Sequence, residues 1–399
     1  MRRVLVLINN TGLGGTERRL GRLFARMTME EKETVFVLNR GLWAKLVAGD
    51  LVAPAGRCTI RLAEPFGWFA ARLPRAGSLP FWVSKLDYLL MAAYVLLRYG
   101  LASPRMFHVV LGGAYVTLPL MLARRDHRYV ISITDPNLSS HVGSPSALPL
   151  FRAAIRKSHA VDALTEDIAA SLVEGGIERE KICCSEGSVV DLSRFRPQRE
   201  KERLVVFAGR MVNEKNPLLF LEAAPAIHRA IPEARFCLLG DGPLRARIEA
   251  EVDRLGLRSV IRTGFVEDMA SILGPAMVFV SLQRRDNFPS QVLLEAMASG
   301  AATVATDVGL TSRLVDEETG IRVRPSAEEV ARAVIKLLSD PPRCCAMGGR
   351  ARQRVADMHS EERYISYLAG LYARAEAVPR RSRPSTTEEH SVSGALPKP

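Results

Sequence analysis

The chain has 399 residues, of which 47% are hydrophobic and 25% are charged. These values are typical of a globular protein long enough for two domains with separate cores, and they exclude a wholly disordered chain. The formal net charge is +12, and residues 1–100 carry 15 Lys and Arg against 7 Asp and Glu. This basic end favours an anionic partner such as a lipid headgroup or nucleic acid, and the alternative is a set of ordinary solvated arginines.

The six cysteines lack the two-residue gap of a zinc knuckle or redox pair, so we expect free thiols in a reducing cytosol. The short apolar run in MRRVLVLINNTG predicts a first strand and not a signal peptide. The apolar stretch Tyr88–Gly100 is interrupted at Arg98 and is too short to span a bilayer. It could form a core helix or an interfacial one, so contact with an anionic membrane surface is a hypothesis. Without a recognition motif, we expect no nucleic-acid partner.

Short apolar segments alternate with helical patterns in both halves of the chain. The first half has predicted strands at 3–10, 33–38, 107–112 and 128–134, with a glycine-rich loop and a helix over 16–27 after the first strand. The second half has predicted strands at 203–210, 234–240, 260–265, 277–282 and 302–306, with a helix over 216–230. This alternation predicts an α/β fold with parallel sheets covered on both faces, arranged as two Rossmann-like domains that face a cleft.

The polar segment 191–203 predicts the boundary between the two domains. We therefore expect an N-terminal Rossmann-like domain over 1–196 and a C-terminal Rossmann-like domain over 197–359. A terminal helix is expected over 360–378. The tail 379–399 is rich in Pro, Ser and charge and lacks aromatic residues, so it is predicted to be disordered.

Candidate binding residues follow the predicted strands of the second half. Arg210 and Lys215 bracket a turn at the carboxyl end of a strand, where parallel sheets bind ligands, and together they suit an anion. Gly240 lies in a strand–helix turn and allows a ligand to approach the backbone. Phe265 and Val266 follow the next strand and either line a base pocket or pack in the core.

The stretch DNFPSQVLLEAMASG, residues 286–300, predicts a loop followed by a helix. Pro289 is expected in the first helical turn and Gly300 at the end, and the free amides at such a helix start attract phosphate. Glu295 would lie about 9 Å along the helix, at about 1.5 Å per residue. A carboxylate there either binds a ribose diol or pairs with an internal Arg or backbone amide.

These motifs resemble the donor-binding domain of glycosyltransferase family 4, the group 1 glycosyltransferases of GT-B fold. The match is specific from 203 to about 340 and weaker in the first half, where NNTGLGGTERRL and REKICCSEGSVVDLSRFRP carry it. The order and spacing of the stretches in the second half make the resemblance specific. Those stretches are GRMVNEKNP, LLGDGPLR, TGFVEDM and NFPSQVLLEAMASG.

The resemblance implies that the domain over 1–196 lies on the acceptor side, that the domain over 197–359 binds the nucleotide sugar, and that the helix over 360–378 packs back on the first domain. It also implies roles for individual residues. Arg210 and Lys215 would hold the donor diphosphate, Glu295 the ribose and Asp286 the transferred sugar. The absence of an Asp-x-Asp pair favours a metal-independent enzyme without a cofactor, and a UDP- or GDP-sugar would be the co-substrate. The expected catalytic residues are Asp286 and Asp135, and the expected donor-binding residues are Gly14, Gly15, Arg210, Lys215, Gly240, Phe265, Val266, Asn287, Phe288, Pro289, Ser290 and Glu295.

The sequence departs from the family pattern in two places. The family has seven residues between two Glu, a spacing that puts Asn287 in the first acidic position, whereas Asp286 is one residue further away. We expect Asp286 to take the role, with Asn287 as a neighbour. Thr134 stands where a His is common, so Asp135 either orients the acceptor hydroxyl or caps a turn. The glycines near residue 14 either approach the donor or only form a tight turn.

The resemblance implies a retaining glycosyltransferase in cell-surface polysaccharide synthesis, such as lipopolysaccharide synthesis. It would move a hexose or N-acetylhexosamine to a glycan or lipid-linked acceptor, in the cytoplasm or at the inner face of the cell membrane. The alternatives are a non-catalytic sugar-nucleotide-binding or scaffolding subunit and a nucleotide-sugar epimerase on the same fold. The sequence leaves the donor base, sugar, acceptor and oligomeric state open.

Overall fold

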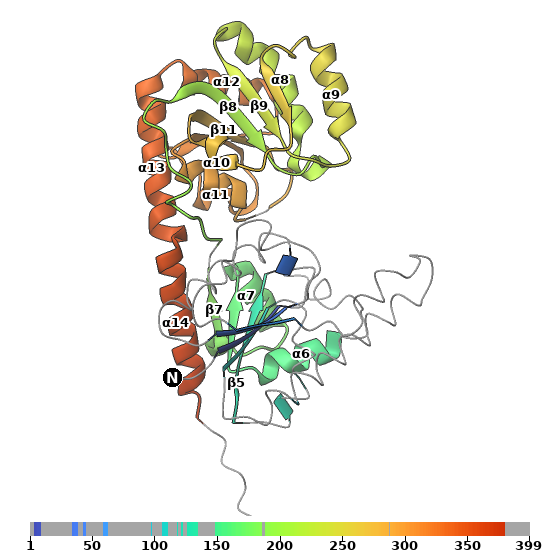
Figure 1. Ribbon diagram of the computed structural model, residues 1–399, viewed down its shortest axis with the longest axis vertical. Coiled ribbons are helices and arrows are strands. Elements are labelled where there is room, and N and C mark those ends of the chain that lie inside the picture. Colours follow the sequence, from blue (N-terminus) through green and yellow to red (C-terminus); the bar gives the residue numbers. More distant parts are fainter. Residues whose placement is uncertain are drawn as a thin grey trace, which may run out of the picture.

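The protein consists of two stacked α/β domains, with two long helices running along one side of both (Figure 1). Each domain contains one parallel sheet with helices on its faces. The structure is a computed structural model, and it describes residues 4–8, 34–38, 43–44, 59–62, 97, 106–110, 118, 121–122, 126–134, 148–185, 188–286 and 288–379.

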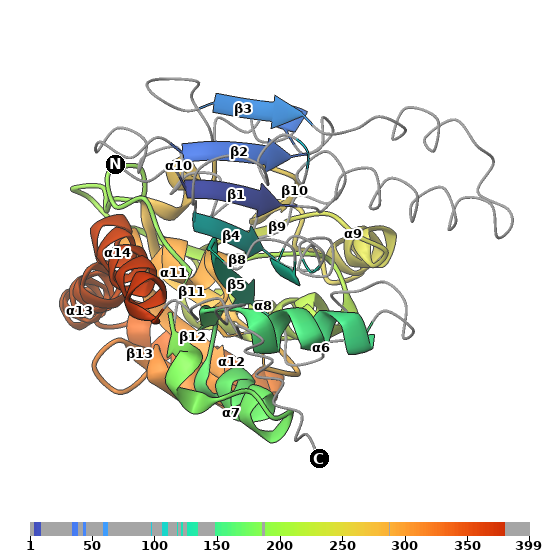
Figure 2. The ribbon, with the colours of Figure 1, turned by 90° about the horizontal axis from the view of Figure 1, so that it is seen from below.

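The first sheet has seven described strands in the order β3-β2-β1-β4-β5-β6-β7, all parallel. Figure 2 shows the molecule from below, with β3, β2, β1 and β4 side by side. The strands predicted near 3–10, 33–38, 107–112 and 128–134 are all confirmed. The strands are β1 (Val4–Ile8), β2 (Thr34–Leu38), β3 (Thr59–Leu62), β4 (Met106–Val110), β5 (Arg128–Ile133), β6 (Ala160–Ala163) and β7 (Ile182–Cys184).

Helices cover both faces of the first sheet. Helices α6 (Leu148–Lys157) and α7 (Glu166–Glu174) pack on one face through an apolar cluster that includes Phe151 and Leu172. Helix α14 (Glu361–Ala377) packs on the other face through Leu368 and its neighbours. Both faces are therefore buried, which explains why β1, VLVLI, is apolar throughout.

A buried polar network also fixes α14 to the first sheet. On α14, the Tyr367 hydroxyl donates to Asp162 Oδ1 on β6 over 2.8 Å, and the Tyr372 hydroxyl lies 2.8 Å from His108 Nδ1 on β4. His108 Nε2 lies 2.8 Å from Ser132 Oγ on β5, which donates to Asp162 Oδ2 over 2.6 Å. Because a buried carboxylate is costly without partners, this network specifies where α14 docks.

The second sheet has six described strands in the order β10-β9-β8-β11-β12-β13, again all parallel. The predicted strands of the second half are confirmed. The strands are β8 (Glu202–Ala208), β9 (Arg235–Leu239), β10 (Ile261–Gly264), β11 (Ala276–Ser281), β12 (Ala302–Thr306) and β13 (Gly320–Val323).

Helices α8 and α12 cover one face of the second sheet, and α10 and α11 cover the other. Phe220 on α8 is fully buried against Phe207 and Phe236, and burying such a side chain contributes about 1.5–3 kcal/mol. Asp340 and Ser360 cap the two long helices by accepting hydrogen bonds from backbone amides. The helices are α8 (Pro217–Ala230), α9 (Arg245–Arg254), α10 (Met269–Leu273), α11 (Gln291–Ala298), α12 (Ala327–Leu338) and α13 (Pro341–His359).

Helices α13 and α14 connect the domains. They meet at Ser360, so the chain passes from the second domain back to the first there, and Figure 1 shows them as one column. The sequence predicts a helix close to α14 but does not predict α13. The tail beyond 379 and most of the apolar stretch 88–100 lie outside the described residues.

The structure also bears on the cysteines and on the length of the helices. The five cysteines that the structure describes are free thiols, as predicted. Among the described residues, the helices are too short or too polar to cross a bilayer.

Candidate active site

The loop after β8 brings Arg210 and Lys215 to the carboxyl edge of the second sheet. It passes very close to the loop after β9, because a Cβ added at Gly240 would lie 1.8 Å from the Gly209 carbonyl oxygen. Gly240 also has a φ of +143°, which favours glycine. The Met211 amide donates to Asp241 O over 2.9 Å and further joins the two loops. Gly240 is therefore required for the loops to meet at this edge.

Lys215 is half-buried, and its ammonium group donates to Gln283 Oε1 over 3.0 Å. Burial and, to a smaller extent, the positive charge of Arg210 together lower the pKa of Lys215 from 10.5 to about 8. Arg210 itself is exposed. A cation held in partial burial beside a second cation is destabilised until an anion arrives, so the pair is suited to bind a polyanion.

The loop after β11, residues 282–290, is held against the loop after β8. The Arg284 amide donates to Glu214 O over 2.9 Å, and its guanidinium donates to Asn216 Oδ1 over 3.1 Å. Thr306 on β12 donates its hydroxyl proton to Gln283 O over 2.6 Å. These contacts place Gln283 where its side chain accepts the hydrogen bond from Lys215. The loop after β8 therefore supplies the cation, and the loop after β11 supplies its hydrogen-bond acceptor.

Asp286 is exposed near the end of this loop. Its Oδ1 accepts hydrogen bonds from the amides of Phe288, at 3.2 Å, and Leu310, at 3.3 Å. A Cβ added at Gly309 would lie 2.2 Å from Asp286 Cγ, so the carboxylate rests against that glycine. Asp286 therefore joins its own loop to the turn after β12. It also lines a concave site with Gln283, Phe288, Ser290, Thr306 and Thr311.

Helix α11 begins at Gln291 with Ser290 as its N-cap. Pro289 therefore precedes the N-cap, and the prediction that Pro289 lies in the first helical turn is wrong. The reason is that the extended backbone of Ser290, with φ −72° and ψ 117°, separates the proline from the helix. Ser290 is buried, and its side chain makes no capping hydrogen bond to the first amides of α11. These amides follow directly after the loop that carries Asp286 and Phe288.

The carboxyl end of α11 is covered by two cations. Lys201 donates to Ser299 O over 2.7 Å and to two further carbonyls, and Arg352 on α13 donates to Ala298 O. Positive charge at this end complements the helix dipole, whose other end attracts anions. Close packing assists, because a Cβ added at Gly348 of α13 would lie 2.2 Å from Gly300 O. These contacts therefore stabilise the position of the carboxyl end of α11.

Glu295 lies in the middle of α11 and is half-buried. Its Oε1 accepts a hydrogen bond from the Gln291 side-chain amide over 3.2 Å. It lies four residues past the helix start, about 6 Å along the axis at about 1.5 Å per residue. Gln291, four residues earlier on the same helix, is therefore one hydrogen-bond partner of Glu295.

Phe265 and Val266 follow β10 at the same edge of the sheet. Phe265 is 69% exposed, so it is not a core residue, whereas Val266 packs partly against the cluster that contains α11 residues. An exposed aromatic ring beside a ligand edge is available to stack on a base. The Gly240 amide bonds to Gly264 O over 2.8 Å and holds this loop beside the glycine turn.

Several predicted residues lie outside the described part of the chain. Asp135 follows the half-buried Thr134 at the end of β5, and Asn287 lies between Asp286 and Phe288. Gly14 and Gly15 also belong to this group. The second domain therefore carries the described part of the site. Sequence reasoning missed Gln283, Gln291 and Thr306, although the i−4 spacing of Gln291 from Glu295 is a signal that could have found one of them.

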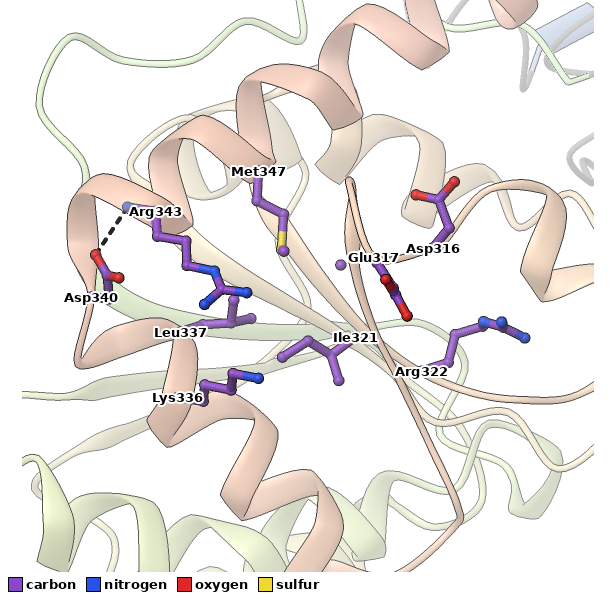
Figure 3. A pocket seen from close by; sticks show the side chains of 10 residues that line it. Asp316, Glu317, Ile321, Arg322, Lys336, Leu337, Asp340, Arg343 and Met347 are labelled. Atoms are coloured by element: carbon purple, nitrogen blue, oxygen red, sulfur yellow. Dashed lines mark hydrogen bonds between the residues drawn. The ribbon is translucent and has the colours of Figure 1, made fainter.

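In the ranges that the structure describes, no group of three or more His, Cys, Asp or Glu side chains is arranged to hold a metal ion. A pocket of about 480 Å³ opens between β13, α12 and α13 (Figure 3), with Ile321, Leu337 and Met347 at its apolar part. It lies at the amino end of β13, opposite the ligand edge, and cations and anions alternate around it, including Asp316 and Lys336. It is not a polyanion site.

The fold matches solved two-domain glycosyltransferases of the GT-B type. The structure of Anabaena HepE in complex with UDP superposes with a TM-score of 0.71 over 94% of this chain and 100% of that chain, at 14% identity. Sucrose-phosphate synthase from Thermosynechococcus elongatus gives 0.68 over 95% and 100%, at 20% identity. The class of fold is therefore GT-B.

Sequence comparison gives the family. Residues 202–340 match the model for "Glycosyl transferases group 1". The alpha-D-kanosaminyltransferase of Streptomyces kanamyceticus is 30% identical over 286 residues, which cover 67% of this chain and 73% of that protein. The GDP-mannose-dependent alpha-(1-6)-phosphatidylinositol dimannoside mannosyltransferase of Mycobacterium tuberculosis is 29% identical over 201 residues, 47% of this chain and 51% of its own length. The chain belongs to the group 1 glycosyltransferases.

Proposed function

We propose that the protein transfers a hexose or N-acetylhexosamine from a nucleoside diphosphate sugar to an acceptor hydroxyl, with retention of configuration. One observation carries the proposal. The ammonium of Lys215 is held in partial burial beside Arg210, at the ligand edge of a parallel sheet and opposite the loop that leads into α11. This is the geometry that a diphosphate would stabilise.

Each residue of the site has a role in this proposal. Arg210 and Lys215 hold the diphosphate, with the first amides of α11 directed at it. Glu295 accepts two hydrogen bonds from the ribose diol. Phe265 and Val266 contact the base, and Gly240 lets the donor approach the backbone. The other proposed donor contacts are Gly14, Gly15, Asn287, Phe288, Pro289 and Ser290.

Asp286 is proposed to contact the transferred sugar. Its Oδ1 is occupied by the amides of Phe288 and Leu310, and we assign Oδ2 to a sugar hydroxyl. The two hydrogen bonds from backbone amides fix the orientation of the Asp286 carboxylate. A sugar that binds to Oδ2 is therefore held in a defined position relative to the loop. Asp135 is proposed to orient the acceptor hydroxyl from the first domain.

The proposed reaction needs no metal ion and no cofactor. The bond between the sugar C1 and the diphosphate oxygen breaks, and the acceptor oxygen bonds to C1 on the same face. The acceptor proton passes to the leaving phosphate oxygen. Arg210, Lys215 and the α11 amides offset the charge that develops on the leaving group. Closure of the domains over the donor would exclude water.

The proposed donor is a UDP- or GDP-sugar and the proposed acceptor is a glycan or a lipid-linked glycan of the cell surface, such as a lipopolysaccharide precursor. The relatives support this class, since one is named a GDP-mannose-dependent enzyme that acts on phosphatidylinositol dimannoside. The basic excess in residues 1–100 favours a cytoplasmic protein at the inner face of the membrane. Absence from membranes washed at low salt would count against that location.

The proposal is tested by incubating the protein with UDP- and GDP-sugars and extracted glycolipids, followed by NMR of the product. A new glycosidic bond with the donor's anomeric configuration is expected, together with loss of transfer in Arg210→Ala. Donor binding without transfer to any acceptor would favour a scaffolding subunit, and an altered sugar nucleotide formed without an acceptor would favour an epimerase.

A further inference from the structure

The chain crosses between the domains at residues 188–190, and adjacent side chains there pack in different cores. Val189 packs in the cluster that joins β1, β4 and α14 of the first domain. Val190 packs in the cluster that contains α11 and β11 of the second domain. The Val190 amide donates to His359 O over 3.0 Å, beside the junction between α13 and α14. The two crossings of the chain are therefore joined at this point.

Helix α11 is linked to residues 189–195 at both of its ends, directly at its amino end and through Arg352 of α13 at its carboxyl end. At its carboxyl end, Arg352 donates to Ala298 O and also to Leu192 O, at 3.2 Å, and Phe195 O, at 2.8 Å. At its amino end, the Gln291 side-chain amide donates to Val189 O over 3.1 Å. The helix that would hold the donor ribose is thus tied directly to the segment about which the domains would turn.

Gln291 is the residue that joins the crossing to Glu295. Its Nε2 donates to Val189 O and to Glu295 Oε1, and these two acceptors take both hydrogens of the amide. If the side-chain amide were flipped, its carbonyl oxygen would face the two acceptors Val189 O and Glu295 Oε1, and neither hydrogen bond could form. In the described part of the chain, Gln291 Oε1 is buried and has no hydrogen-bond donor. The side chain therefore makes its two donated bonds at the expense of a buried acceptor.

We infer that Gln291 is a positioning residue that couples the ribose-binding carboxylate to the interdomain crossing. It holds Glu295 in the orientation that accepts the ribose diol and holds Val189 at a fixed distance from α11. Donor binding at Glu295 then stabilises one orientation of the crossing, and the closed arrangement of the domains favours donor binding in return. This inference rests on the proposed function, in which Glu295 binds the ribose.

The test compares Gln291→Met, which keeps the length of the side chain and removes both donated bonds, with a matched control. Gln353 on α13 is exposed and donates to Asp357 Oδ1 at i+4 over 2.8 Å, so Gln353→Met removes a similar helical bond away from the crossing. If Gln291→Met does not fold, Gln291→Asn replaces it, because its shorter amide reaches at most one of the two acceptors.

The first readout needs no ligand. Hydrogen exchange of peptides that span 188–196 is measured in the unliganded protein. We expect the Val190 amide to exchange about tenfold faster in Gln291→Met, a factor that corresponds to about 1.4 kcal/mol, and to be unchanged in Gln353→Met. Unchanged exchange in Gln291→Met would overturn the inference.

The second readout uses UDP and GDP as probes. In Gln291→Met we expect about tenfold weaker binding by calorimetry and, at saturating nucleotide, a smaller decrease in the X-ray scattering radius of gyration than in the wild type. Wild-type compaction at saturation would overturn the coupling, because a purely local packing role would leave it unaltered. If Glu295→Ala fails to weaken wild-type binding, the proposed function fails instead, and the exchange measurement still decides the role of Gln291.

Discussion

Removal of the partly buried charge at Lys215 should stabilise the unliganded protein while weakening diphosphate binding. The pKa of Lys215 is lowered from 10.5 to about 8 by burial and by Arg210. At about 1.4 kcal/mol per pKa unit, the charged form costs about 3 kcal/mol in the folded protein. Loss of the hydrogen bond to Gln283 offsets part of this gain. For Lys215→Met we expect a net stabilisation of about 1–2 kcal/mol at pH 7.

The pH dependence identifies the cause. Below pH 8 the folded wild type carries the full cost of the charge, whereas between pH 8 and 10.5 the unfolded chain holds the proton more tightly, so wild-type stability rises with pH. Urea titrations at pH 7, 8.5 and 10 should therefore show the advantage of Lys215→Met shrinking as pH rises. Calorimetry with UDP and GDP should show at least about tenfold weaker binding in the variant. A variant that is less stable than the wild type at pH 7, or a difference that does not change with pH, would refute this reasoning.

Two further predictions concern stability. Gly240→Ala would place a Cβ 1.8 Å from Gly209 O at a φ of +143°, so we expect a loss of more than about 2 kcal/mol in urea titrations. Gly370→Ala, in open space on α14, is the control and should be neutral or slightly stabilising. Burial lowers the pKa of His359 to about 4, so stability should fall as pH decreases from about 6.5 towards 4, by up to about 3 kcal/mol, and His359→Gln should flatten that fall. A Gly240→Ala protein of wild-type stability, or an acid response that His359→Gln leaves unchanged, would contradict these predictions.

The strands of both sheets were predictable because most are apolar throughout. Segments such as VLVLI and AMVFVS are buried on both faces of parallel sheets, so their composition alone indicates them. The strands that the sequence did not predict are short or contain polar residues whose hydrogen-bond partners come from distant parts of the chain. Strand β6, AVDA, contains the buried Asp162, whose hydrogen-bond donors include Ser132 on β5 and Tyr367 of α14, which is more than 200 residues away in the chain.

Helix α13 was not predictable for a similar reason. Its sequence contains the pair Gly348–Gly349, which weakens a helix by about 1 kcal/mol per glycine. The structure explains Gly348, because a Cβ there would lie 2.2 Å from Gly300 O. The glycine permits the close approach of α13 to the end of α11, and that contact is invisible in the local pattern.

For the candidate site as well, the sequence predicts the general location but not the contacts between residues that are distant in the chain. The order of motifs placed Arg210, Lys215 and Glu295 on one edge of the second domain, because loops after parallel strands converge there. The partners of these side chains could not be predicted. Gln291 bonds to a carbonyl 102 residues earlier in the chain, and Asp286 bonds to an amide 24 residues later. The offset of Pro289 from α11 depends on the backbone of a single residue, Ser290.

The central claim is that Glu295 and Arg210 form a binding site for a sugar nucleotide. The most direct test is calorimetric titration of the wild type, Arg210→Ala and Glu295→Ala with UDP and with GDP. We predict that one nucleotide binds with one-to-one stoichiometry and that each substitution weakens its binding at least about tenfold. Binding of neither nucleotide, or binding that is indifferent to both substitutions, would contradict the claim.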